Sequence, residues 1–161
     1  MKLLYYPHES LSTPCVEVIK ADLDLDTVLD EMIKIMLDNQ GMGLSGNQVG
    51  LNYRIFVMKD GRGRIWEFIN PVLSHKYDTQ FLKEGCLSLP GVTIEVPRAK
   101  QVIVTAFNRN WKEFKVGCID IEAVCIQHEM DHLDGKFVLD GLSRQEKRSI
   151  LRKAQKYVQK N

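Results

Sequence analysis

The chain has 161 residues, 44% of them hydrophobic and 27% charged, with a formal net charge of +1 at pH 7. This composition excludes an intrinsically disordered chain and fits a single domain, 1–161, that is long enough to bury a core. No apolar run approaches the roughly 20 residues of a membrane-spanning helix, and the first residues lack the long apolar stretch of a signal peptide.

Helix and strand patterns along the chain predict a compact α+β domain. Residues 26–40 carry apolar side chains at near-helical spacing and stop before Gly41, so they predict a helix. Short segments rich in β-branched or aromatic residues follow at 54–58, 65–69, 92–96, 101–107 and 113–116. Turn residues at 60–63 and 108–110 lie between neighbouring segments, and this pattern predicts antiparallel sheets.

A second helix is expected over 119–133, and it contains the sequence HEMDH at 128–132. On a helix, two histidines at this spacing project from one face and can hold one metal ion, with Glu129 within reach of a metal-bound water. The residues before the pair include four that are apolar, Ile119, Ile121, Val124 and Ile126. They favour a helix that runs through the core, where unpaired polar groups are costly, over a helix with histidines on a solvated face.

A catalytic site of this kind usually has three protein ligands and one open position, so a third ligand must come from elsewhere. In the metzincin pattern the third ligand is a histidine that follows the pair, but Val138 occupies its position here. A glutamate on a later helix is the other familiar solution, but the only downstream glutamate, Glu146, begins a helix of its own. Neither pattern fits the chain.

Cysteines are the other candidates for the third ligand. Cys125 lies on the same helical stripe as the histidines, but about 10 Å along the axis from His132, so it is better interpreted as a buried apolar side chain. Cys86 lies in the sequence EGCLS, which suggests a core strand. The residues alone leave His8, His75 and several carboxylates as alternatives. Because the cysteines form no CxxC pair, we expect a cytoplasmic protein.

A last helix is expected over 143–161, because Ser143 and Glu146 can form a capping box. Glu146 is the only acidic residue in this segment, and the other charged residues are basic. A solvated helix that packs through Leu151 and Val158 explains this pattern as well as docking on an RNA surface, where lysine and arginine neutralise phosphates.

Three motifs of this chain resemble those of the peptide deformylase family, which read roughly GxGLAAxQ, EGCLS and QHEMDHLxG. The corresponding segments are GMGLSGNQ at 41–48, EGCLS at 84–88 and QHEMDHLDG at 127–135. The second and third motifs are complete, whereas Ser45 and Gly46 replace the usual alanine pair of the first. The resemblance also includes the segments around Tyr6 and Arg98, and so covers nearly the whole chain.

The resemblance implies antiparallel sheets packed around a central metal-binding helix. It also implies a hydrolase that removes the N-formyl group from the N-terminal methionine of new polypeptides and releases formate. Cys86, His128 and His132 would hold one divalent metal ion, natively Fe²⁺, with Zn²⁺, Ni²⁺ or Co²⁺ as substitutes. N-formylmethionyl nascent peptides would be the partners, with no membrane or DNA, and the C-terminal helix would offer a contact to the ribosome.

The resemblance also implies a role for the residues around the metal. Glu129 would take the proton of the attacking water and deliver it to the leaving amine, unless it only orients a ligand. The backbone N–H of Leu87 and the side-chain amide of Gln48 would stabilise the oxyanion, although Gln48 could instead cap a turn. Arg98 and Asp131 look like a pair that fixes the ligands from outside.

An apolar pocket beside the metal would accept the methionine side chain of the substrate. By resemblance it would be lined by Met42, Leu82, Ile121, Val124 and Cys125, although all of these fit an ordinary core equally well. The rest of the peptide would lie extended along Gly43, Leu44 and Gly85, and would be bound through its backbone.

Two other functions fit parts of the pattern. A metalloprotease that cuts internal peptide bonds would use the same helix motif. This chain, however, has no third ligand downstream of His132 in the pattern that such proteases use. A binding module stapled by a metal would need neither Glu129 nor Gln48, because a structural site has no open position to serve.

Overall fold

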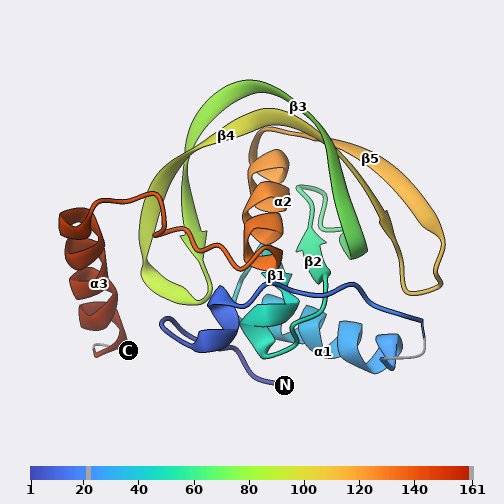
Figure 1. Ribbon diagram of the computed structural model, residues 1–161, viewed down its shortest axis with the longest axis horizontal. Helices are drawn as coiled ribbons and strands as arrows, with labels where there is room; N and C mark the ends of the chain where they lie inside the picture. The colour runs from blue at the N-terminus through green and yellow to red at the C-terminus, as the bar shows by residue number, and fades with distance from the viewer. Residues whose placement is uncertain (21–22, 160–161) are drawn as a thin grey trace.

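The structure is a computed structural model that describes residues 1–20 and 23–159. The helices and strands are α1 (Leu25–Asp38), β1 (Gly43–Ser45), β2 (Ile55–Lys59), β3 (Ile65–Cys86), β4 (Leu89–Phe107), β5 (Glu113–Ile119), α2 (Asp120–Leu133) and α3 (Arg144–Val158), with short 3-10 helices at Glu9–Ser12 and Gly46–Val49. Figure 1 shows β3, β4 and β5 arching over α2, while α1 lies across the open end of the arch and α3 beside the β3–β4 hairpin.

The described strands form one five-stranded antiparallel sheet in the order β1-β2-β3-β4-β5. This arrangement confirms the predicted α+β class with antiparallel pairing around a central helix. The turns predicted at 60–63 and 108–110 connect β2 to β3 and β4 to β5. The strand β1 was not predicted, because its three residues lie within the glycine-rich segment and carry no strand pattern.

The two central strands are much longer than predicted, with 22 residues in β3 and 19 in β4. The predicted strands at 92–96 and 101–107 are one strand that continues through Pro97. β5 pairs with β4 only from Gln101 onward, so at Pro97 the strand has β3 as its one paired neighbour. A proline can occupy such an edge position because its missing N–H costs no ladder hydrogen bond.

Helix α2 is mostly buried from Ala123 to Leu133, beyond its first turn. Val124 and Ile126 are buried as expected, whereas Ile119 and Ile121 are exposed at the start of the helix. The buried part also carries four polar side chains, those of Gln127, His128, Glu129 and His132. Burial of so many polar groups is costly unless they are paired or bind a ligand, so this part of the helix marks the functional site.

The ends of the helices follow from local capping. The side chain of Asp24 caps α1, and Ser143 and Glu146 form the predicted capping box of α3. The last two residues of the helix predicted over 143–161, Lys160 and Asn161, lie outside the described residues. Within the described chain, no helix has the length and apolar character needed to cross a membrane.

Candidate metal centre

Three side chains from distant parts of the chain meet in the core. Cys86 ends β3 at the tip of the β3–β4 hairpin, and His128 and His132 lie on successive turns of α2. The Cys86 Sγ is 3.3 Å from the His132 Nε2, which is 3.1 Å from the His128 Nε2. All three ligand atoms lie within 4.8 Å of one another, and all three residues are buried.

These distances fit a shared metal ion. Tetrahedral bonds of about 2.0–2.1 Å to nitrogen and about 2.3 Å to sulfur place two nitrogens roughly 3.3 Å apart, and a nitrogen and a sulfur roughly 3.5 Å apart. The observed separations are close to both values. The donor set of one thiol and two imidazoles suits Zn²⁺, Fe²⁺, Ni²⁺ or Co²⁺. The residues therefore fit a divalent metal with one position left for a non-protein ligand.

Glu84 is hydrogen-bonded to the ring nitrogen of His128 that faces away from the metal position. Its Oε2 lies 2.8 Å from the His128 Nδ1, so it accepts that proton and leaves the lone pair of Nε2 directed at the metal position. The Arg98 guanidinium donates to both oxygens of Glu84, at 2.6 and 3.0 Å, and donates at 2.5 Å to Asp131. The structure thus places Arg98 and Asp131 in contact with each other and joins them to His128 through Glu84.

The carboxylate of Glu84 stays ionised although it is buried. Burial raises the pKa of Glu84, but the hydrogen bonds from His128 and Arg98 outweigh this effect and lower it. From the sequence, Glu84 was expected to orient its loop through hydrogen bonds rather than to touch substrate, but its contact with His128 was not predicted. A signal was nevertheless present, because residues two apart on a strand face the same side, and Glu84 precedes Cys86 by that spacing.

Replacing Glu84 with glutamine is expected to weaken metal binding by about 10–100-fold, because the amide is a poorer acceptor for the His128 proton. The affinity is measured by competition with a chelator of known strength. Glu67→Gln is the matched control. Glu67 also lies on β3 and pairs with an arginine, Arg109, but it is remote from the centre. Equal affinities in the two variants would show that Glu84 does not orient the ligand.

Glu129 presents a buried carboxylate beside the metal position. Its Oε2 has no hydrogen-bond partner among the described residues. Burial raises the pKa of Glu129 to about 7, although the neighbouring His128 and the hydroxyl of Ser45 lower it. Gly43 allows β1 to lie against this carboxylate, because a Cβ there would be 2.5 Å from the Glu129 Oε1 and 2.8 Å from the Cys125 Sγ. A carboxylate with these properties can accept and release a proton near neutral pH.

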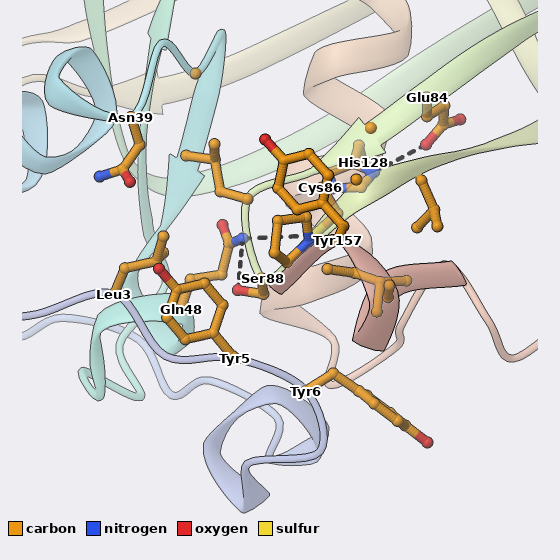
Figure 2. Close-up of a pocket in the computed structure, with 18 of the residues that line it drawn as sticks. Leu3, Tyr5, Tyr6, Asn39, Gln48, Glu84, Cys86, Ser88, His128 and Tyr157 are labelled. Atoms are coloured by element: carbon orange, nitrogen blue, oxygen red, sulfur yellow. Dashed lines mark hydrogen bonds and ion pairs between the residues drawn. The ribbon is translucent and has the colours of Figure 1, made fainter. Parts of the chain in front are cut away.

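Gln48 is held so that its amide nitrogen faces the centre. Its Oε1 accepts hydrogen bonds from the Ser45 backbone N–H at 2.9 Å and the Ser45 hydroxyl at 3.0 Å. Its Nε2 donates to the Ser88 Oγ at 3.1 Å and lies 3.6 Å from the Cys86 Sγ (Figure 2). Gln48 therefore caps the short 3-10 helix with its oxygen, and this cap directs its nitrogen toward the metal position.

The departures from the first motif have structural consequences. The Ser45 hydroxyl also lies 2.9 Å from the Asn47 Oδ1, and the Asn47 Nδ2 donates at 2.5 Å to the backbone oxygen of His132. Ser45 thereby links Gln48 to α2 through Asn47. An alanine at Gly46 would not fit without a backbone shift, because its Cβ would be 2.5 Å from the Leu51 carbonyl oxygen.

A cleft of about 1250 Å³ opens beside the centre. Its walls include eight residues predicted from the sequence as substrate contacts or oxyanion donors: Met42, Gly43, Gln48, Gly85, Leu87, Ile121, Val124 and Cys125. Burial raises the pKa of the Cys125 thiol, so it remains protonated and acts as an apolar wall. Two predicted contacts lie elsewhere, since Leu44 is fully buried in the core under α1 and Leu82 pairs with Val96 along the β3–β4 hairpin.

The alternative histidines lie outside this centre. The His8 ring accepts a hydrogen bond from the Ser10 backbone, and His75 is exposed and stacks on Tyr77. Both ends of the described chain also line the cleft, through Tyr5 and Tyr6 near the N-terminus and Tyr157 on α3. The resemblance included the segment around Tyr6, but no local pattern placed Tyr5 or Tyr157 at the cleft, because only the docking of the chain ends brings them there.

Comparison with known proteins gives a consistent result. A sequence model of the family described as polypeptide deformylase matches residues 1–148. A peptide deformylase of Hamiltonella defensa subsp. Acyrthosiphon pisum is 36% identical over 158 residues, which are 97% of this chain and 92% of that protein. The crystal structure of a peptide deformylase from Legionella pneumophila has a TM-score of 0.92 and 34% identity, and covers 98% of this chain and 95% of its own. A peptide deformylase from Ehrlichia chaffeensis in complex with actinonin has a TM-score of 0.91 and 32% identity, with coverage of 98% and 96%.

Proposed function

Because this chain belongs to the polypeptide deformylase family, metal-dependent hydrolases that remove the formyl group from N-terminal methionine, we propose that Cys86, His128 and His132 form its catalytic metal centre. The protein removes N-formyl groups from nascent peptides with the help of a metal ion. The observation that carries the residue assignment is the meeting of one sulfur and two ring nitrogens beside Glu129, whose Oε2 has no partner in the described chain.

Each residue has a role in the hydrolysis of the formyl amide. Cys86, His128 and His132 would hold a divalent metal ion, which would supply a Lewis acid able to lower the pKa of water toward neutrality. Glu129 accepts the proton of the attacking water and then donates it to the methionine nitrogen as the carbon–nitrogen bond breaks. The Gln48 Nε2 and the Leu87 backbone N–H donate to the formyl oxygen, where negative charge develops. Formate and a free N-terminus leave.

The methionine side chain occupies the apolar part of the cleft. Met42, Val124 and Cys125 are among the residues that line it. The peptide that follows lies extended along β1 and the end of β3, where backbone groups of Gly43 and Gly85 are within reach. Contacts through the backbone accept many different side chains after methionine.

Fe²⁺ is the native metal in this proposal. A thiol with two imidazoles does not select between the divalent first-row metals by affinity alone, so metal supply and reactivity decide the occupant. We expect higher turnover of formyl-Met-Ala-Ser by anaerobically prepared Fe²⁺ protein than by Zn²⁺ protein, both measured by formate release at equal metal content. Higher turnover by the Zn²⁺ protein would reject iron as the native metal.

The competing function, cleavage of internal peptide bonds, is tested with the same preparation. Formyl-Met-Ala-Ser is incubated beside an unformylated peptide of about ten residues, and the products are separated by mass. Deformylation requires the loss of formate from the first peptide, with the second left intact. Cleavage of the second peptide without formate release from the first would reject the proposal.

We also propose that the protein is cytoplasmic, where its four free cysteines remain reduced. We further propose that its basic helix α3 binds the ribosome. Helix α3 packs through Leu151 and Ala154 and presents Arg148, Arg152 and Lys156 on another face. A basic face beside an apolar packing face suits contact with RNA. Co-sedimentation with ribosomes should be lost when these three residues are changed to glutamate, and retained binding would reject the docking.

A further inference from the structure

Helix α3 shares a core with the hairpin that carries a metal ligand. Ala154 is buried, and Ile150 and Leu151 pack beside it against Leu89 and Ile94 of β4. Cys86 belongs to the same cluster of buried residues. The matched part of the family model ends at residue 148, so most of α3 lies beyond it. Apolar packing therefore holds α3 against β4 of the hairpin that carries Cys86.

Tyr157 extends this packing to the cleft. Its ring lies against Gly91 of β4, where a Cβ would overlap the ring and come within 2.6 Å of the Cδ2. Gly91 has a φ of +79°, a backbone conformation that also favours glycine. The side chain of Tyr157 is nevertheless 47% exposed and lines the cleft together with Cys86, His128 and Glu129. One side of the residue thus packs on β4, and the remainder is accessible from the cleft (Figure 2).

A second tyrosine lines the same cleft from the other end of the chain. Tyr5 is 52% exposed, and its neighbours Leu4 and Tyr6 are bonded through their N–H groups to the backbone oxygens of Gln48 at 2.8 Å and Ser88 at 2.9 Å. Figure 2 shows Tyr5 and Tyr157 with Gln48 and Ser88 between them. The two ends of the chain therefore supply aromatic surface beside the residues proposed to act on the formyl group.

We propose that Tyr157 is a specificity-determining residue that contacts the apolar side chains of the second and third residues of the formyl peptide. The methionine pocket is built by Met42, just before β1, and by Val124 and Cys125 of α2, so α3 is left to meet the residues that follow. A half-exposed tyrosine ring on a rigid support binds apolar groups at little cost in side-chain entropy. This inference rests on the proposed function, because the peptide must enter the cleft with its formyl group at the metal.

The test compares a short and an extended substrate. For Tyr157→Ala we expect the KM of formyl-Met-Leu-Phe to rise about tenfold with unchanged kcat, because one aromatic contact is lost. The KM of formyl-Met-Ala should stay within about twofold of wild type, since alanine is too small to reach the ring. Tyr157→Phe keeps the ring and should keep the wild-type KM for both peptides. Tyr77→Ala is the matched control, because Tyr77 is 51% exposed on β3 and stacks on His75.

Gly91→Ala gives an independent test. The added methyl group displaces the ring of Tyr157, so the same selective rise in KM is expected, and it should not add to the rise in the double variant. An unchanged KM for formyl-Met-Leu-Phe in Tyr157→Ala overturns the inference. An equal loss on both peptides does so too, because it indicates a purely structural role. Absence of formate release by the wild type from either peptide would instead overturn the proposed function itself.

Discussion

Replacing Glu129 with alanine is expected to lower kcat for formyl-Met-Ala-Ser by roughly 10²–10⁴-fold, the usual contribution of a positioned general acid–base group. Two proton transfers depend on this carboxylate, one from the attacking water and one to the leaving nitrogen. The buried position that raises the pKa of Glu129 to about 7 suits both transfers at neutral pH. The metal should stay bound, because its three ligands are unchanged. Formate release under anaerobic conditions and the metal content of the same sample are the two measurements.

Glu122→Ala is the matched control for this variant. Glu122 lies on the first turn of α2, where its Oε1 accepts the backbone N–H of Gly61, remote from the metal ligands. It should retain wild-type kcat. A Glu129→Ala protein with full metal content and wild-type kcat would show that the proton is carried by another group.

Replacing Cys86 with alanine is expected to abolish both stoichiometric metal binding and activity. The thiolate is the one anionic ligand of the proposed set, and two imidazoles alone bind a divalent ion much more weakly. The loss of activity should exceed about 10³-fold, because the variant loses the Lewis acid together with its acidic water. Metal content after gel filtration and formate release measure the two effects. The thermal unfolding midpoint should no longer respond to added metal.

Cys118→Ala provides the comparison, since it removes another buried thiol. Cys118 lies on β5 within the core, and burial raises the pKa of its thiol to about 11. Its replacement should cost stability but leave metal content and kcat unchanged. Wild-type metal content in Cys86→Ala would mean that the ion is held elsewhere.

Local chemistry made part of this molecule predictable. The spacing of His128 and His132 depends only on the helical repeat, and the capping box at Ser143 depends on two residues of one turn. Both features hold in the structure. Cys86 is 42 residues away from His128 along the chain, and no local rule joins them. Its position near the histidines was reached through the resemblance of three motifs, while its spacing on β3 explains the role of Glu84.

Other features needed the folded chain. Residues 72–83 of β3 are mostly exposed, and many of them are polar. They therefore show no clear alternation of apolar residues, and the length of this strand could not be inferred from the sequence. Pro97 divided β4 into two predicted strands because proline usually interrupts a sheet. The entry of Tyr157 into the cleft depends on how α3 docks on β4, which is a matter of tertiary packing alone. Helix amphipathicity indicates an apolar face but does not say which surface it covers.

The most direct measurement is the extended X-ray absorption fine structure of the metal bound to the anaerobically loaded protein. A centre built from Cys86, His128 and His132 predicts one sulfur at about 2.3 Å, two imidazole nitrogens at about 2.0–2.1 Å and a light atom from solvent. If Cys86→Ala retains some metal, the spectrum of that metal should lack the sulfur contribution. A wild-type spectrum without sulfur, or with a fourth protein ligand that closes the remaining position, would contradict the account.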